Sequence, residues 1–362
     1  MAAPMDDISI NLFRYPNLVF KTYLREAIQI SKRAMLRVGF VPPPFRIQID
    51  ITDKCNFRCP TCIKWNSDPS RRELNTDEWK TIFEKLRNVP LLREVTIGGG
   101  EPFMRKDILD ILRFPKAQGL YTVVISNGWH VTASTLGQLG KIGVDRLMVS
   151  LNSLRESVHD QSRGAPGSYK RIMSLIDSWR DQPKTIDLCL ANVIMEPNCE
   201  ELSLLARFVS EKEMNGIIYQ VLAPVEAHYP FSKSSKMPHS ARDWYRDNPL
   251  WVRRIGVLHR QIQELLNLKK QAFPIINPFS QLRKFPTYYK NPNAIRKIPC
   301  LGTLTTLYID PFGDIRLCYG FPPIGNIVRD NPHQIWRGNR ARRIRREAKH
   351  CTRLCRLLNN NI

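Results

Sequence analysis

The chain of 362 residues has no apolar run of the roughly 18 residues that a membrane-spanning helix needs, so the sequence predicts no such helix. Its first residues, Met1 to Asp7, lack a basic region followed by an apolar core, and we therefore expect no secretory signal. Histidine is scarce, and the histidine nearest to Cys62 in sequence is His130. These absences lead us to expect a cytoplasmic protein, and they exclude a compact zinc knuckle that combines histidine with the first cysteines.

Acidic residues are scarce as well. The chain has 33 Asp and Glu against 55 Lys and Arg, which gives a formal net charge of +22 at pH 7. A field of this sign favours an anionic partner, such as nucleic acid, a phosphorylated substrate, an acidic peptide or an anionic lipid surface, without choosing among them. The alternative explanation, which accounts for the net charge about as well, is that it serves only to keep the protein soluble.

Three of the nine cysteines, Cys55, Cys59 and Cys62, form a group with the spacing Cys-x3-Cys-x2-Cys directly after an alternating strand pattern. In a reducing cytosol, such a group favours metal ligation over disulfides. A [4Fe-4S] cube has four irons and each thiolate holds one, so three cysteines leave one iron open to another ligand. The alternative, a zinc site, needs four ligands in tetrahedral geometry.

This spacing resembles the signature of the radical SAM enzymes. The resemblance implies a [4Fe-4S] cluster whose open iron binds S-adenosylmethionine (SAM), and reductive cleavage of SAM to a 5′-deoxyadenosyl radical that abstracts hydrogen from a substrate. The protein then binds and orients the reactants and excludes water, while the cofactor supplies the chemistry. Family members often have an aromatic residue where Thr61 stands here, so we expect Phe57 or Trp65 to supply the surface near the adenine.

Residues 45–222 alternate between strand and helix patterns. Helical patterns such as Thr76 to Leu86, with Asn75 or Thr76 as its cap, separate the strands. The alternation predicts an α/β fold with a parallel sheet and crossover helices. The resemblance implies a partial (β/α)6 TIM-like barrel, whose sites lie at the carboxyl ends of the strands. The six predicted strands are Arg46 to Ile51, Glu94 to Ile97, Thr122 to Ser126, Arg146 to Ser150, Ile186 to Val193 and Gly216 to Leu222.

Each further motif of this region follows a predicted strand. Gly98-Gly99-Gly100-Glu101-Pro102 is similar to the Gly-Gly-Glu-Pro segment of the family, in which glycine lets the backbone approach SAM. Turn chemistry is the alternative interpretation for Asn127, and for Asn152, where relatives usually have aspartate. The planar fork of Arg163 suits the SAM carboxylate. The SAM-binding residues that the resemblance implies are Gly99, Gly100, Glu101, Pro102, Ser126, Asn127, Ser150 and Arg163.

Cys189 shares one face of the fifth predicted strand with Asp187. If that face lines the barrel, Cys189 is a candidate hydrogen-atom donor to a substrate radical, as thiols are in radical SAM epimerases. The alternative interpretation is a buried cysteine that packs as a small hydrophobe.

A second cysteine group lies near the carboxyl end of the chain. Its four members are Cys300, Cys318, Cys351 and Cys355, and two short predicted strands flank an Asp310-Pro-Phe-Gly313 turn between the first two. The frame resembles the SPASM/twitch auxiliary modules of radical SAM proteins, and with four cysteines it is similar to the twitch type. The resemblance implies a second, auxiliary [4Fe-4S] cluster in a small α+β domain, and a four-cysteine zinc site is the alternative.

These patterns divide the chain into four parts. A basic amphipathic pattern over residues 17–38 predicts a helix that either closes the barrel or lies on an anionic membrane. A clear helical stripe runs from Trp251 to Lys269, and a dense basic segment covers 337–346. The parts are a helical extension at 1–44, the radical SAM barrel at 45–223, a bridging helical segment at 224–299 and the auxiliary domain at 300–362.

The resemblance predicts oxidation, epimerisation or cross-linking of an unactivated C–H bond in a peptide or other natural-product intermediate. An aminocyclitol or sugar alcohol dehydrogenase is the close alternative. A basic protein that binds nucleic acid or a membrane surface, with structural clusters, is the alternative of another class. The expected partners are a peptide or small-molecule substrate, an electron donor such as flavodoxin or ferredoxin, and a peripheral membrane contact. Nucleic acid is not expected.

Overall fold

The computed structural model describes residues 41–62, 64, 70–223, 244–298, 300–351, 354 and 355. The predicted amphipathic helix over 17–38 lies outside these residues, as does Trp65. The membrane contact proposed for that helix therefore stays a prediction. None of the helices in the described ranges has the length and apolar character needed to span a bilayer.

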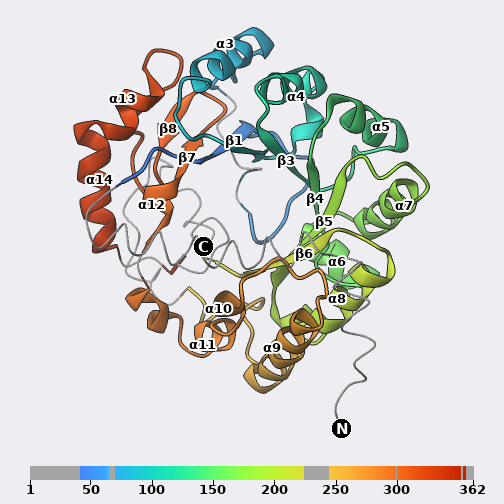
Figure 1. The fold of residues 1–362 in the computed structure, drawn as a ribbon. Coiled ribbons are helices and arrows are strands. Elements are labelled where there is room, and N and C mark those ends of the chain that lie inside the picture. The colour runs from blue at the N-terminus through green and yellow to red at the C-terminus, as the bar shows by residue number, and fades with distance from the viewer. Residues whose placement is uncertain are drawn as a thin grey trace.

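The described residues form one sheet of nine strands, in the order β6-β5-β4-β3-β2-β1-β7-β8-β9. Neighbouring strands from β6 to β7 are parallel, and helices surround them on the outside (Figure 1). This confirms the predicted partial barrel. The barrel strands are β1 (Arg46–Thr52), β2 (Glu94–Gly99), β3 (Tyr121–Ser126), β4 (Arg146–Ser150), β5 (Asp187–Ile194) and β6 (Gly216–Val221).

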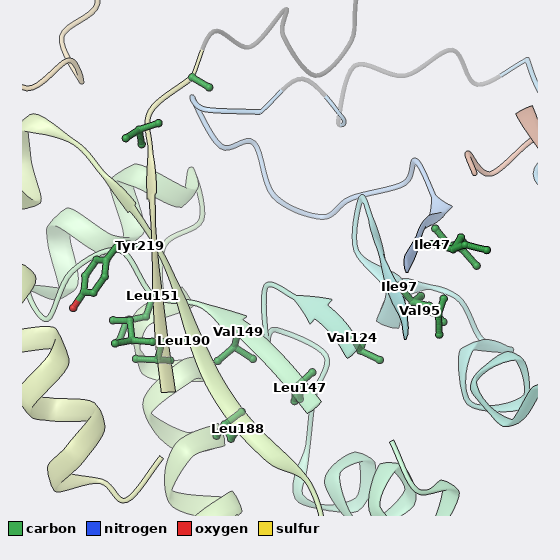
Figure 2. Close-up of a cluster of buried hydrophobic side chains, with 14 of the residues drawn as sticks. Ile47, Val95, Ile97, Val124, Leu147, Val149, Leu151, Leu188, Leu190 and Tyr219 are labelled. Carbon is green, nitrogen blue, oxygen red and sulfur yellow. The ribbon is translucent and has the colours of Figure 1, made fainter. Parts of the chain in front are cut away.

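The core lies between the sheet and the outer helices. Figure 2 shows alternate residues of successive strands gathered in it, among them Ile47, Leu147 and Leu190. Because side chains alternate along a strand, residues such as Arg46, Asp50 and Ser150 face the inside of the barrel, which we call the lumen. The helices that cover the barrel are α3 (Thr76–Leu86), α4 (Ile108–Ala117), α5 (Ala133–Ile142), α6 (Glu156–Arg163), α7 (Ser168–Arg180) and α8 (Leu202–Glu211).

Local capping sets helix boundaries that the sequence predicts. Asn75 caps α3 because its side chain accepts from Glu78 N at 2.9 Å and its own N–H donates to the Glu78 carboxylate at 2.8 Å. The bridging helix α9 (Ile255–Lys270) begins four residues later than expected. Trp251 instead packs its ring against Tyr289, with 4.7 Å between ring centroids, and stays outside the helix.

The bridging segment continues the sheet beyond β6. Ile217 N donates to Pro274 O at 2.8 Å, and Ile276 N donates to Ile217 O at 2.8 Å. Short helices follow α9 along this side of the barrel. They are α10 (Phe279–Leu282), α11 (Phe285–Lys290) and the 3-10 helix η6 (Pro292–Lys297).

The carboxyl-terminal segment joins the other edge of the barrel. Strand β7 (Thr306–Ile309) pairs in parallel with β1, and β8 (Asp314–Arg316) and β9 (Gly325–Asn326) extend the sheet in antiparallel pairs. The two predicted strands about the Asp310–Gly313 turn are thus confirmed as β7 and β8. The helices of this segment are α12 (Gly302–Thr305), α13 (Pro332–Arg337) and α14 (Asn339–Lys349).

Candidate functional site

The first cysteine group follows β1 at the carboxyl end of the barrel. Cys59 is buried, while Cys55 and Cys62 are partly buried. With Phe57, all three pack in a small apolar cluster that also contains Ala165 and Trp129. Two main-chain donors point at the sulfurs: Phe57 N lies 3.5 Å from Cys55 Sγ, and Lys64 N lies 3.4 Å from Cys62 Sγ.

The chemistry of these thiols suits a bound cationic centre. Burial raises the pKa of Cys55 and of Cys62 above the usual thiol range, although the N–H donors act in the opposite direction. Buried thiols need a metal to become thiolates, and N–H groups aimed at sulfur stabilise the thiolate form. The three cysteines therefore fit an iron–sulfur cluster.

Glycines of the second loop let its backbone pack on the cysteine loop. Gly100 N donates to Thr52 O at 2.7 Å, and Glu101 N donates to Lys54 O at 2.8 Å. A Cβ on Gly100 would lie 2.1 Å from Lys54 O, and one on Gly99, whose φ is +120°, would lie 2.3 Å from Thr52 O. The glycine run thus fixes the cysteine loop against β2.

Glu101 joins the ends of β2 and β3. Its carboxylate accepts hydrogen bonds from Ser126 Oγ at 2.8 Å, Asn127 N at 2.7 Å and Phe103 N at 3.1 Å. Burial raises the pKa of this carboxyl, and these donors act against that rise. Pro102 begins the short helix η2 (Pro102–Met104) that follows. The side chains of Glu101 and Ser126 therefore already have protein partners at the candidate SAM site.

The turn after β3 reaches across to the cysteine loop. Asn127 Nδ2 donates to Asn56 Oδ1 at 2.8 Å, and Asn127 Oδ1 accepts from Trp129 N at 2.9 Å. The Trp129 ring meets the edge of Phe57 with 5.7 Å between centroids. Sequence reasoning missed Trp129, although it directly follows the Ser126-Asn127-Gly128 motif. Phe57 is only 2% exposed, so its ring fills the loop and presents little surface to a ligand.

Arg163 is the candidate for binding the SAM carboxylate. It ends α6 with its guanidinium 5.7 Å from the Phe57 ring centroid, and its charge acts against the burial that raises the pKa of Cys62 and of Glu101. Its buried Nε has no hydrogen-bond partner in the described part of the chain. A buried guanidinium N–H without an acceptor beside the cysteines fits an anionic ligand. Ser150 ends β4 on the lumen face, partly buried.

The side chain of Asn152 forms hydrogen bonds with other parts of the fold. Its Nδ2 donates to Ser162 Oγ at 2.9 Å, and its Oδ1 accepts from Val193 N at 3.1 Å. Asn152 N donates to His159 Nδ1 at 3.1 Å, and burial, together with nearby Arg163, lowers the pKa of His159 to about 3. His159 is thus a neutral acceptor that holds the loop after β4.

Three cysteines of the second group, Cys300, Cys318 and Cys355, lie near Tyr308. Charges on Cys318, Cys300 and Cys355 all act on the pKa of this buried tyrosine, and Gly320 N donates to Cys318 Sγ at 3.2 Å. Within the described ranges, no three His, Cys, Asp or Glu side chains converge as ligands of a single metal ion. The thiolates of a [4Fe-4S] cube bind separate irons and need no common point, so this result does not argue against a cluster.

Cys189 lies in β5, five residues before its carboxyl end at Ile194. That separation is roughly 16 Å along a strand. The side chain is fully buried, and its charge acts on the pKa values of Arg146 and Tyr121, which stand near the amino ends of their strands. This position favours the packing interpretation of Cys189 and leaves hydrogen donation a prediction.

Two family models match the chain. The radical SAM superfamily matches residues 49–195, and an iron–sulfur cluster-binding domain, SPASM, matches residues 300–357. Both candidate cysteine groups fall inside these ranges.

Two curated proteins illustrate the similarity. The AdoMet-dependent heme synthase of Methanosarcina barkeri is 26% identical over 83% of this chain and 84% of its own length. The PqqA peptide cyclase of Bradyrhizobium diazoefficiens is 28% identical over 44% of this chain. The match spans 43% of the cyclase, less than half of its length.

Solved structures share the fold. Streptococcus suis SuiB bound to the precursor peptide SuiA superposes with a TM-score of 0.64 at 17% identity, over 89% of this chain and 72% of its own. The enzyme anSMEcpe with bound AdoMet and the Cp18Cys peptide gives a TM-score of 0.60 at 11% identity, over 88% of each chain. The two family models, which match residues 49–195 and 300–357, show that the chain belongs to the radical SAM superfamily, as an enzyme that uses SAM, a SAM-binding [4Fe-4S] cluster and an auxiliary iron–sulfur site in a SPASM domain.

Proposed function

We propose that this enzyme oxidises or cross-links a peptide at an unactivated C–H bond inside the barrel lumen. The observation that carries the proposal is the contact between Tyr319, next to Cys318, and Asp50 on the lumen face of β1, at 2.8 Å. Because β1 leads into Cys55, a substrate in the lumen would lie close to both cysteine groups. Bound SAM supplies the hydrogen-abstracting radical, and an auxiliary cluster supplies an acceptor for the substrate's second electron.

The residues of the chain bind and orient the reactants in this proposal. Arg163, at the end of α6, would hold the SAM carboxylate through its guanidinium fork, and Ser150, at the end of β4, would help to bind SAM. Gly99 and Gly100 hold the cysteine loop, while Glu101 and Asn127 fix the neighbouring turns. Phe57 and Trp129 keep water away from the cysteines.

A peptide substrate is supported by the relatives. The PqqA peptide cyclases have a peptide in their names, and SuiB and anSMEcpe have structures with bound peptides. A tetrapyrrole substrate is the second candidate, because the heme synthase match extends over most of both proteins. The aminocyclitol or sugar dehydrogenase stays a third candidate from the sequence, since its reaction also needs an electron acceptor.

We further propose that an acidic electron donor of the flavodoxin or ferredoxin type docks on α14, in the cytoplasm. The helix packs its buried residues inward and against α12, which follows Cys300, and it ends two residues before Cys351. Its outer face is basic and exposed over Arg340, Arg342, Arg343, Arg346 and Lys349. A positive surface beside a redox site speeds the association of an acidic protein.

The donor proposal has a direct test. R340E/R343E/R346E should slow reduction by acidic flavodoxin by roughly tenfold or more at low salt, while dithionite, a small reductant, should reduce the variant as it does the wild type. Equal rates with flavodoxin would overturn the docking site.

The substrate proposal is tested with the reconstituted full chain, SAM and three substrates: precursor peptides encoded beside its gene, a propionate-bearing tetrapyrrole and an aminocyclitol. Loss of two hydrogens from a peptide, with label from a deuterated peptide appearing in 5′-deoxyadenosine, supports the leading proposal. Turnover of the tetrapyrrole or the aminocyclitol alone would replace it. SAM cleavage with no change in any of them would contradict all three.

A further inference from the structure

Asp50 connects the two cysteine groups through side chains. Its Oδ2 accepts hydrogen bonds from Tyr319 Oη and from Lys64 Nζ, each at 2.8 Å. Lys64 also pairs with Asp53, and its main-chain N–H donates to Cys62 Sγ. Asp50 and Lys64 are 3% and 6% exposed, so this junction is shielded from water.

Tyr319, on the other side of Asp50, lies next to a cysteine of the auxiliary group. Tyr319 directly follows Cys318, whose sulfur accepts from Gly320 N at 3.2 Å. The Tyr319 ring packs on Tyr308 with 4.7 Å between centroids, and Tyr308 lies among the auxiliary thiols. The carboxylate of Asp50 thus links Tyr319, which follows Cys318, with Lys64, which lies two positions after Cys62.

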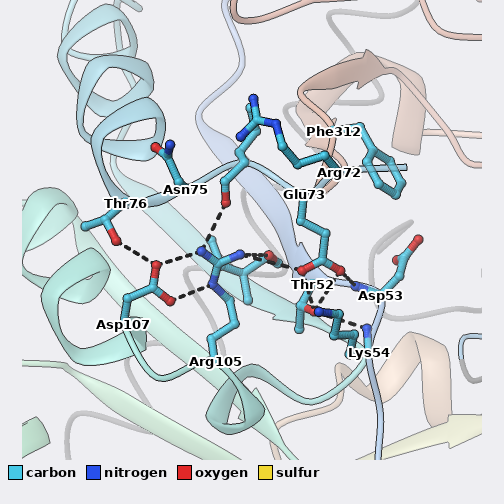
Figure 3. A network of polar contacts seen from close by, with 12 residues as sticks. Thr52, Asp53, Lys54, Arg72, Glu73, Asn75, Thr76, Arg105, Asp107 and Phe312 are labelled. Atoms are coloured by element: carbon cyan, nitrogen blue, oxygen red, sulfur yellow. Dashed lines mark hydrogen bonds and ion pairs between the residues drawn. The ribbon is translucent and has the colours of Figure 1, made fainter. Parts of the chain in front are cut away.

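The base of the radical loop, residues 53–73, is anchored independently of this junction. Figure 3 shows Glu73 accepting from Thr52 Oγ1 at 2.9 Å and from Asp53 N at 2.8 Å. Arg105 pairs with Asp107 at 2.8 Å in the same view. Arg105 also donates to Leu74 O at 3.0 Å. These contacts tie both ends of the radical loop to the barrel.

Other contacts between the two segments start from Arg71 and Leu74. Arg71 stacks 3.8 Å from the Phe312 ring centroid and pairs with Asp314 at 3.2 Å, and Leu74 N donates to Pro311 O at 2.9 Å. The Arg71 side chain is 46% exposed, and exposed ion pairs add little. The bond between Tyr319 and Asp50 is part-buried, and because Asp50 is 3% exposed it is better shielded from water than this ion pair.

We propose that Asp50 is a positioning residue that couples the auxiliary site to the SAM site. When the auxiliary cysteines hold their cluster, Tyr319 is fixed, Asp50 keeps its orientation, and Lys64 holds Cys62 in the geometry that binds SAM. Loss of the auxiliary cluster frees Tyr319, and the SAM site loosens although its own cysteines are intact. The inference rests on the two cluster sites and is independent of the substrate.

The test is a double-mutant cycle read by SAM binding, not by turnover. Equilibrium dialysis measures the dissociation constant of SAM for four reconstituted full-length proteins: wild type, C351A/C355A, Y319F, and the combination. Iron analysis confirms that each keeps the radical cluster. We expect C351A/C355A to weaken SAM binding by about tenfold in the wild-type background and by less than about twofold in the Y319F background.

Two further variants keep the result interpretable. D50N retains the shape of the side chain, and it should weaken SAM binding as Y319F does, with all seven ligand cysteines present. Y308F removes a hydroxyl from the other ring of the same pair and should preserve the coupling. The role of Asp50 would be overturned if C351A/C355A weakened SAM binding equally in both backgrounds, or in neither. Loss of the coupling in Y308F would also overturn it.

Discussion

The carboxylate of Glu101 accepts a hydrogen bond from the main-chain N–H of Asn127 at 2.7 Å, which joins the end of β2 to the end of β3. With Ser126 Oγ and Phe103 N as its other donors, Glu101 is surrounded by N–H and O–H groups. The acid of the Gly-Gly-Glu-Pro motif is therefore a structural acceptor in this chain.

E101Q should lower the free energy of unfolding by about 1–3 kcal/mol, because the amide NH2 would face buried donors. Chemical denaturation of the apo chain measures the change. E211Q, at an exposed helix position, is the control and should change stability by less than about 0.5 kcal/mol. An E101Q protein as stable as E211Q would show that the carboxylate network contributes nothing.

R163A should weaken SAM binding by about 10- to 100-fold, because the SAM carboxylate loses a charge-assisted partner. R163K should fall between R163A and the wild type, since lysine keeps the charge but lacks the fork. Iron content should not change in either variant. R180A, at the exposed end of α7, is the control. If the SAM affinity of R163A equalled that of the wild type, Arg163 would not be a SAM-binding residue.

G100A should disrupt the radical loop, because a Cβ at this position would lie 2.1 Å from Lys54 O and 2.6 Å from Lys54 C. We expect the reconstituted variant to lose about four irons per chain, the content of one cube. G256A is the matched control in α9, where a Cβ meets nothing within 4 Å, and it should raise stability by roughly 0.5–1 kcal/mol. Normal iron in G100A would argue against close packing of the two loops.

His159 should make stability depend on pH. Its pKa is about 3 in the folded chain against 6.5 for an ordinary histidine, so folding favours the neutral form. That stability is present above pH 6.5 and declines as the pH falls toward 3, by roughly 2 kcal/mol between pH 7.5 and 5. H159Q should lose this part of the decline in denaturation curves at the two pH values. Identical pH dependence in wild type and H159Q would contradict a buried neutral His159.

Local patterns predicted much of the fold. Strand β4 begins and ends as predicted, and Asn75, one of the two predicted caps, caps α3, because alternation and capping act between residues close in sequence. The cysteine spacings also indicated both cluster sites. The Tyr319–Asp50 contact joins residues 269 positions apart, and no local signal encodes it. Asp50, between Ile49 and Ile51, indicated only that this side of the strand is polar.

Side-chain roles at the site were harder to predict than positions. Glu101 and Asn127 lie where the motifs place them, yet their polar atoms bind other protein groups. The spacing of a motif gives the position of a turn, but it does not show which protein groups its polar side chains bind. The helix α14 shows the same limit, because its basic residues were evident while its packing on α12 depends on the tertiary fold.

The central claim is that Cys55, Cys59 and Cys62 support reductive SAM cleavage in this barrel. The most direct measurement is 5′-deoxyadenosine formed from SAM and dithionite by the anaerobically reconstituted full chain, beside C59A and C189A. We predict 5′-deoxyadenosine from the wild type and C189A, and none above background from C59A. No product from an iron-loaded wild type, or equal product from C59A, would contradict the account.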